Sequence, residues 1–290
     1  MNILIVGENA GAHALAWKFA ESRRTGELYC TSPYSGIDTL CTRIEEPPDI
    51  WSGSHRVDLV VGQEDAPLYI VSDSCLQKAI HITVDCLTDG HTIVPMPAVL
   101  LHRNETGEIT AAETPASAYT AELAHYAYHQ FFIPHIRIHG HARRGIAGIV
   151  RFELELWEGK TELLSVERGF GELDALALLP LLRGELAGLL KACENETLTR
   201  EMLRLNGFHS AVCMLGASRS GVPICGLGDV PSDTGVFLGT VQYRDGTLYT
   251  AGPRPLFVCG RGQDTPSARH AARVGAEKIR FEGVQRYYFT

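Results

Sequence analysis

Apolar and polar positions alternate in blocks along the first part of the chain. Residues 3–6 form a short apolar run that is typical of a buried parallel strand. Apolar residues then recur at helical spacing over residues 12–22, and further apolar runs follow at 26–30 and 57–61. Strands that alternate with a helix predict a doubly wound parallel sheet, whose ligand loops lie at the carboxyl ends of the strands.

The pattern changes after residue 82, where pairs of short apolar runs flank tight turns. Residues 83–87 and 91–95 lie on either side of an Asp-Gly turn, and residues 148–157 are followed in the same way by 161–166. These spacings predict two β-hairpins.

Helical spacing and further apolar runs mark the rest of the chain. Three long helices are predicted at 121–132 (closed by Pro134), 173–192 and 265–281, a short helix at 198–205, a loop at 104–120, and strands at 211–215, 236–242, 248–251 and 256–259. The whole pattern predicts three packed units: residues 1–82 as the doubly wound sheet, 83–205 as a mixed sheet with helices, and 206–290 as a small α/β unit.

Composition narrows the class of protein. The 290 residues are 45% hydrophobic and 21% charged, which is ordinary for a globular protein. A formal net charge of −8 disfavours nucleic acid as the main partner. No apolar stretch reaches eighteen residues and no basic leader precedes the first strand, so neither a membrane span nor a signal peptide is predicted. The eight cysteines form no CxxC pair, and we expect free thiols in a cytoplasmic protein.

Candidate metal ligands are few and poorly arranged. His135 and His139 lie four residues apart beside His141, in a run that also holds three arginines, and His125 and His129 share a helical face. The first group has no nearby carboxylate, and the second lacks the Glu that zinc proteases carry between their two histidines. We therefore predict no metal site, and interpret the basic run as a solvated surface or a contact for an anionic ligand or partner.

The turn between the first strand and the first helix has one feature that favours phosphate binding and one that opposes it. Its sequence, Gly7-Glu8-Asn9-Ala10-Gly11, lies at a helix N-terminus, where backbone amides commonly bind phosphate. The carboxylate of Glu8, however, would repel an anion.

Five stretches carry a resemblance to a known family. They are HALAWK at 13–18, VDLVV at 57–61 with DAPL at 65–68, LTDGHTIVPMP at 87–97, DGTLYTAGPR at 245–254, and the terminal helix at 271–283. They resemble phosphoribosylamine–glycine ligase (GAR synthetase), an ATP-grasp enzyme of purine biosynthesis. The resemblance implies a pre-ATP-grasp-like N-terminal sheet, an ATP-grasp central domain and a small C-terminal α/β domain.

The departures from the family pattern concern ATP and magnesium, which the resemblance would imply as cofactors. The chain passes almost directly from the first unit to the hairpin at residue 87, so the nucleotide-binding lobe is expected to be missing. Ser165 stands where the family has a metal-binding Glu, and Glu167 stands at its Asn position. In the first turn, Gly11 replaces the family's Arg. We therefore expect neither cofactor.

The family's pocket lies where its three units meet. Its counterpart here is predicted to be an open, shallow substrate site lined by Gly7, His13, Asp65, Pro67, Gly171, Glu172 and Arg254. Two of these assignments have plain alternatives: His13 as a packed residue at a helix start, which we favour, and Glu172 with Asp174 as acids that stabilise a helix N-terminus. Three functions stay open: binding or acting on an aminoribose-phosphate-like metabolite without ATP, a pseudoenzyme that scaffolds or regulates a partner enzyme, and a retained ligase.

Overall fold

A four-stranded parallel sheet forms the N-terminal layer of the computed structural model, which describes residues 1–45, 47–48, 51, 55, 57–62, 69–70, 79–138 and 146–289. The strand order is β3-β2-β1-β4, and each pair runs parallel. This confirms the predicted parallel sheet. The strands are β1 (Ile3–Val6), β2 (Leu28–Cys30), β3 (Thr42–Arg43) and β4 (Leu59–Gly62).

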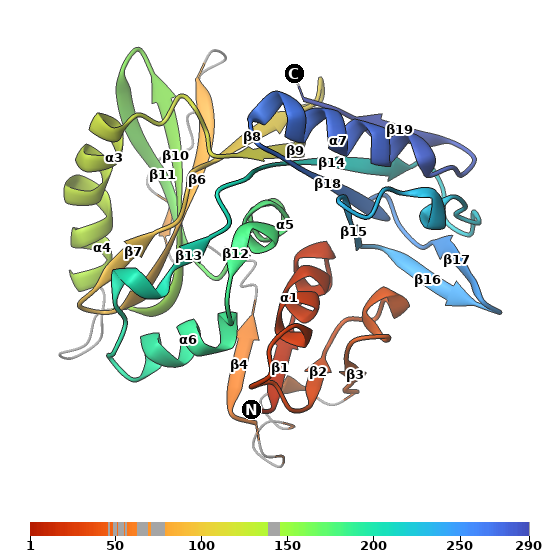
Figure 1. The fold of residues 1–290 in the computed structure, drawn as a ribbon, viewed down its shortest axis with the longest axis horizontal. Helices are drawn as coiled ribbons and strands as arrows, with labels where there is room; N and C mark the ends of the chain where they lie inside the picture. Colours follow the sequence, from red (N-terminus) through yellow and green to blue (C-terminus); the bar gives the residue numbers. More distant parts are fainter. Residues whose placement is uncertain are drawn as a thin grey trace.

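A large antiparallel sheet takes its strands from the described residues between 69 and 287 (Figure 1). Its order is β15-β18-β14-β9-β8-β6-β10-β11-β5, with β7 paired to β6 and β19 to β14. The strands are β5 (Tyr69–Ile70), β6 (Ile80–Asp89), β7 (Ile93–Pro95), β8 (Val99–Arg103), β9 (Ile109–Thr114), β10 (Ala147–Trp157), β11 (Lys160–Arg168), β14 (His209–Ala217), β15 (Gly235–Leu238), β18 (Leu256–Gly262) and β19 (Val284–Tyr287). The pairing of β14 with β9 crosses the predicted boundary at residue 205, and the division into units stays a prediction.

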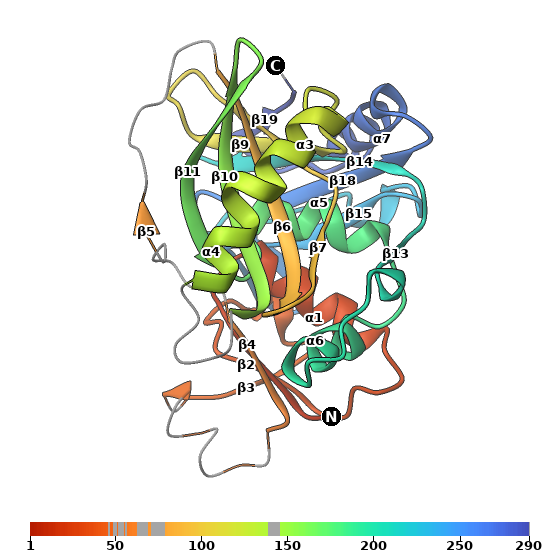
Figure 2. The same ribbon diagram turned by 90° about the vertical axis from the view of Figure 1, so that its left-hand side faces the viewer.

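Both predicted hairpins are confirmed. β6 pairs antiparallel with β7, and β10 pairs antiparallel with β11. Along β10 the side chains alternate between two environments. Val150, Phe152 and Leu154 are fully buried under α3 (Ala121–Ala127) and α4 (Ile133–Ile138), which cover that face of the hairpin in Figure 2. Arg151 and Glu153 point to the opposite face, where the candidate site lies.

Two small two-stranded sheets complete the strand pairing in the described part of the chain. β12 (Leu182–Arg183) pairs with β13 (Arg204–Leu205), and β16 (Val241–Arg244) pairs with β17 (Thr247–Thr250). The predicted strand at 236–242 is therefore wrong as one unit, because Gly239 separates β15 from β16.

Three helix predictions need correction. The helix from residue 121 does not close at Pro134: a π turn at Tyr128–Phe132 leads into α4, and Pro134 lies in the first turn of α4, where proline is tolerated. The leucine-rich run at 173–192 is two helices, α5 (Glu172–Leu178) and α6 (Leu186–Glu194), because Pro180 and a left-handed Gly184 separate them. The helix predicted at 198–205 is only a turn, Arg200–Met202, before β13.

The loop prediction for 104–120 is also wrong, since this segment holds β9. The terminal helix α7 (Thr265–Lys278) is confirmed, although it ends three residues earlier than predicted. No helix among the described residues is long and apolar enough to cross a membrane.

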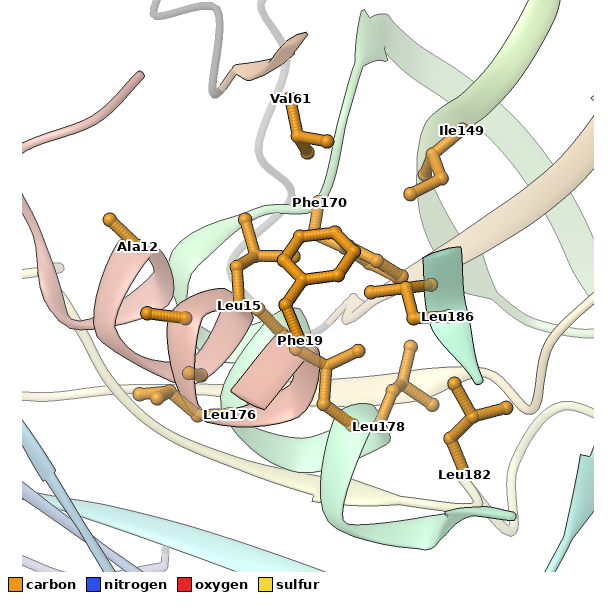
Figure 3. Close-up of a cluster of buried hydrophobic side chains, with 14 of the residues drawn as sticks. Ala12, Leu15, Phe19, Val61, Ile149, Phe170, Leu176, Leu178, Leu182 and Leu186 are labelled. Atoms are coloured by element: carbon orange, nitrogen blue, oxygen red, sulfur yellow. The ribbon is translucent and has the colours of Figure 1, made fainter. Parts of the chain in front are cut away.

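The core fixes how the N-terminal layer meets the large sheet. Helix α1 (Ala10–Ala20) lies against α5, and Figure 3 shows Leu15 and Phe19 of α1 beside Leu176 and Leu178 of α5. Phe19 is fully buried in this cluster. Burial of these side chains brings the N-termini of the two helices to the same place.

Candidate functional site

The carboxylate of Glu172 lies at the N-terminus of α1. Its Oε1 accepts a hydrogen bond from the backbone N–H of Ala10 at 3.1 Å, and its Oε2 accepts one from Nη2 of Arg254 at 2.7 Å. The side chain of Asn9 caps the same helix by accepting from the amides of Gly11 and Ala12. The position in which this turn would bind an external anion is therefore held by a carboxylate of the chain itself.

Arg254 joins this helix terminus to the large sheet. Besides Glu172, it donates to Oε1 of Glu108 at 2.7 Å and to the carbonyl of Ile109 at 3.3 Å. Its guanidinium also lies 5.3 Å from the ring centroid of Phe257. Two carboxylates neutralise Arg254, so its charge is not free for a ligand unless one of them moves.

A cavity of about 320 Å³ opens beside this ion pair. A Cβ on Gly171, one of the lining residues, would come within 2.3 Å of Oδ2 of Asp174 and 2.8 Å of Nε of Arg151, so only glycine fits there without a shift. The cavity is lined by Leu101, Arg103, Gly107, Glu108, Ile109, Arg151, Gly171, Glu172, Leu173, Asp174 and Arg254.

Arg151 is the centre of a buried polar network under the cavity. Its Nε donates to Oδ2 of Asp174 at 2.5 Å and its Nη1 to Oε2 of Glu167 at 2.6 Å, while Oε2 of Glu153 lies 3.8 Å from Nη1. The hydroxyl of Ser165 donates to Oε2 of Glu153 at 2.8 Å, and its oxygen lies 3.3 Å from Oε1 of Glu167. The cluster thus unites β10, β11 and α5 around one guanidinium.

The edges of the network are also paired. Thr83 donates to Oδ1 of Asp174 at 2.6 Å, and Nε2 of His81 lies 2.5 Å from Oε1 of Glu153. Nη2 of Arg103 contacts Nδ1 of His81 at 2.9 Å. This chain of contacts links the network to Arg103, which also lines the cavity.

The network shifts the pKa values of its members. Burial alone would lower the pKa of Arg151, but the surrounding carboxylates, Asp174 first, raise it above its ordinary value. Burial would raise the pKa of Glu153, but the hydrogen bond from His81 and the charge of Arg151 lower it to about 2. Burial and the charge of Asp174 hold the pKa of Asp85 well above its usual range. The environment of Asp85 therefore favours its protonated form, whereas Glu153 is ionised at pH 7.

Magnesium, which the family resemblance implies, does not fit these residues. It requires several oxygen ligands in near-octahedral geometry. Here the carboxylates of Asp174 and Glu167 are paired with Arg151, and that of Glu153 with His81. In the part of the chain that the structure describes, no group of three or more His, Cys, Asp or Glu side chains is arranged to hold a metal ion.

The structure brings together three of the predicted site residues, Gly171, Glu172 and Arg254. The backbone N–H of Gly7 instead donates to Oγ1 of Thr31 at 3.1 Å. Asp65 and Pro67 lie outside the described residues. The assignment of these residues to a substrate site stays a prediction.

His13 packs against β15 rather than facing the cavity. Its Nδ1 accepts a hydrogen bond from the N–H of Leu238 at 3.5 Å. Its ring packs edge-on with the ring of Phe237, and the two ring centroids lie 6.1 Å apart. Burial lowers the pKa of His13 to about 4, so it carries no positive charge at pH 7. This agrees with the packing interpretation that the sequence favoured.

Sequence reasoning missed the cavity residues Arg103, Glu108 and Arg151. Arg151 carried the one available signal, a cation that alternates with buried apolar residues on a strand. That pattern equally describes a solvated sheet face, and only the packing of α5 distinguishes the two.

Comparison with known proteins now adds to this geometry. The model of the phosphoribosylglycinamide synthetase N domain matches residues 1–84. The phosphoribosylamine–glycine ligase of Rhizobium meliloti is 26% identical over 210 residues, covering 68% of this chain and 50% of that protein. The Synechocystis enzyme of the same name is 29% identical over 228 residues, covering 71% and 53%. Together these matches support assignment of the chain to the phosphoribosylamine–glycine ligase family.

The chain spans about half the length of these ligase-family relatives. Among solved structures, the phosphoribosylamine–glycine ligase of Thermotoga maritima superposes with a TM-score of 0.78 at 14% identity, covering 99% of both chains. The pyruvate carboxylase of Rhizobium etli gives a TM-score of 0.68 at 11% identity, covering 98% of this chain and 34% of that one. At such identities these two similarities show the fold alone, a mixed α/β fold with a parallel and a large antiparallel sheet.

Proposed function

We propose that this ligase-family chain binds an aminoribose-phosphate-like metabolite in the cavity beside Arg254 and does not use ATP. The observation that supports it is the meeting of Gly171, Glu172 and Arg254 at the N-terminus of α1, beside the cavity of about 320 Å³. Small-molecule sites commonly range from about 300 to 1,000 Å³, so a single sugar phosphate is the matching ligand size.

The charges around the cavity suit a ligand that carries both signs. Arg254 and Arg103 offer donors for a phosphate, and Glu108 and Glu172 offer acceptors for an amine or for sugar hydroxyls. An amine that neutralises Glu172 would release Arg254 for the phosphate. Because the arginine is otherwise paired, we expect modest affinity that weakens as salt is added.

Two observations support the absence of ATP chemistry. Only residues 63–79 lie between β4 and β6, which is too few for a folded lobe, since domains typically hold about 50–250 residues. Phosphoryl transfer also depends on metal ions and cationic clamps that balance the developing charge. The acids nearest the family's metal position are instead paired within the chain, around Arg151.

Binding of ribose 5-phosphate, measured by calorimetry, tests this function. Arg254→Ala removes one charged donor, and we expect a loss of at least about 10-fold in affinity. Arg244→Ala is the matched control, because Arg244 is exposed on the β16–β17 hairpin, where it contacts Gln242 and the ring of Tyr249, and it does not line the cavity. Equal affinity of Arg254→Ala and Arg244→Ala for ribose 5-phosphate would refute the proposal that the cavity binds such a metabolite.

Two alternatives are outcomes of the same experiments. A pseudoenzyme that scaffolds or regulates a partner enzyme would show no response to ribose 5-phosphate but would co-purify with that enzyme. A retained ligase would bind ATP and form the amide bond in the presence of magnesium. We rank the ligase last for the reasons given above.

A further inference from the structure

A second cavity, of about 410 Å³, opens beside α6 and the small β12–β13 sheet. Arginines from three separate segments line it: Arg24 from the loop after α1, Arg183 from β12 and Arg204 from β13. The chain as a whole carries a formal net charge of −8. A cavity with three guanidinium groups is therefore a local concentration of positive charge on an acidic protein.

Two of these arginines, Arg183 and Arg204, lie directly opposite each other in the antiparallel β12–β13 register. Opposed residues of such a pair project from the same face of the sheet, with Cβ atoms roughly 4.5–5.5 Å apart, and like charges in this position repel. Among the residues that the structure describes, neither side chain takes part in a hydrogen bond or an ion pair. The fold thus holds these opposed arginines together without a counter-charge of its own.

The acids that line the same cavity are engaged elsewhere. Oε2 of Glu185 lies 2.8 Å from Nε of Arg24. The guanidinium of Arg24 also approaches α6 at Gly188, where a Cβ would lie 3.3 Å from its Nη1. Glu201 is fully exposed, and hydrogen bonds from its own backbone and from Thr199 lower its pKa. Neither acid neutralises the opposed arginines.

We propose that this cavity binds the phosphate group of a small phosphate monoester, whose oxygens accept hydrogen bonds from both opposed arginines. One guanidinium fork can satisfy the two oxygens of a carboxylate, whereas a phosphate monoester has three terminal oxygens that can accept from two forks at once. Leu189 and Met202 line the same cavity and offer apolar contact to the organic part of the ligand. This inference goes beyond the proposed function and does not depend on it, because the two cavities share no lining residue.

Proton–nitrogen NMR of the isotope-labelled chain tests this site, because each cavity has two glycines whose amide signals report on it. Gly184 and Gly188 line the cavity with the opposed arginines, and Gly107 and Gly171 line the cavity beside Arg254. Inorganic phosphate should shift the signals of Gly184 and Gly188 along a curve that saturates at roughly millimolar concentration. Acetate at matched ionic strength should not. Phosphate shifts confined to Gly107 and Gly171, or an equal response to acetate, would overturn the proposal.

Variants of the opposed arginines assign the binding to their side chains. Arg204→Gln and Arg183→Gln each remove one charged fork, and each should weaken phosphate binding at this cavity by at least about 10-fold. Both arginines are exposed, so we expect both variants to fold. Arg244→Gln, at an exposed arginine that does not line the cavity, is the matched control and should leave the affinity unchanged. Unchanged affinity in Arg204→Gln, or equal losses in all three variants, would refute the assignment.

Urea unfolding gives a second measurement, which uses the repulsion between the opposed arginines. Without phosphate, Arg204→Gln should unfold at the same or a higher urea concentration than the unaltered chain, because one of two like charges is removed. With phosphate in excess, the unaltered chain should unfold at the higher urea concentration, because only it binds the ligand well. An order of stability that phosphate does not reverse or widen in favour of the unaltered chain would contradict the proposal.

Discussion

Replacement of Glu172 by Gln removes the carboxylate from the N-terminus of α1 while keeping its shape. In the unaltered chain this carboxylate accepts from Ala10 and from Arg254, and so holds the position that an external phosphate would take. The amide of Gln can still accept one hydrogen bond, but it carries no charge. We therefore predict that Glu172→Gln binds ribose 5-phosphate more tightly than the unaltered chain.

The size of the effect follows from distances at Arg254. A phosphate that accepts from Nη2 would lie within about 4 Å of the carboxylate, where like charges repel by about 1 kcal/mol in water and about 4 kcal/mol at the effective dielectric of a protein surface. The Glu172 side chain is 16% exposed, which places the effect between these limits. A relief of about 1–2 kcal/mol corresponds to roughly 5- to 30-fold tighter binding. Loss of one charged hydrogen bond should also lower the free energy of unfolding by about 1 kcal/mol.

The assay is a calorimetric titration of ribose 5-phosphate into three proteins at low salt. Glu185→Gln is the control, because Glu185 pairs with Arg24 away from the cavity and its loss should leave the affinity unchanged. Unchanged or weaker binding in Glu172→Gln would refute the idea that this carboxylate competes with an anion. Equal gains in both variants would point to overall charge instead.

Three further predictions concern stability, measured by urea unfolding. Burial would raise the pKa of Glu113, but hydrogen bonds from His102 and Arg269 lower it to about 2. This ionised acid therefore stabilises the fold fully above its ordinary pKa near 4.5, and the contribution disappears as the pH falls toward 2. Glu113→Gln should lower the free energy of unfolding by about 1–2 kcal/mol at pH 7 and by almost nothing at pH 2. A loss of stability that is the same at both pH values would contradict this. Phe19→Ala should lower the free energy of unfolding by about 3–5 kcal/mol, because it leaves a cavity between α1 and α5. A loss below about 1 kcal/mol would contradict that packing. Gly260→Ala would place a Cβ 2.1 Å from the backbone of α7, so little folded protein is expected; a normal unfolding curve would contradict the close approach.

The sequence predicted best those elements whose signal is local. Strand β1 is a continuous apolar run and was found with its correct bounds, and the β6–β7 hairpin was found from its Asp-Gly turn, although β6 is longer than predicted. The leucine-rich run failed because its apolar spacing continues through Pro180 and Gly184, which interrupt the helix. Strand β9 was missed because Ala111 and Ala112 are small, and they lie between β8 and β14, a strand about a hundred residues later.

The candidate site was predictable only in part, for the same reason. Arg254 and Glu172 were found through the family resemblance, and they do lie together. Nothing local reveals that Glu172 reaches the first turn of α1, because that contact joins residues more than 160 positions apart. Arg151 resembles an outward-facing strand residue, and only the packing of Asp174 over it creates the buried network.

Titration of ATP with magnesium into the unaltered chain is the measurement that tests the central claim most directly. The claim is that Glu172 holds the position at α1 where a phosphate would bind, and that Arg151 pairs with acids that could otherwise bind a cation. On this account calorimetry shows no saturable heat, while ribose 5-phosphate in the same buffer binds measurably. One-to-one binding of ATP with a micromolar constant would contradict the account.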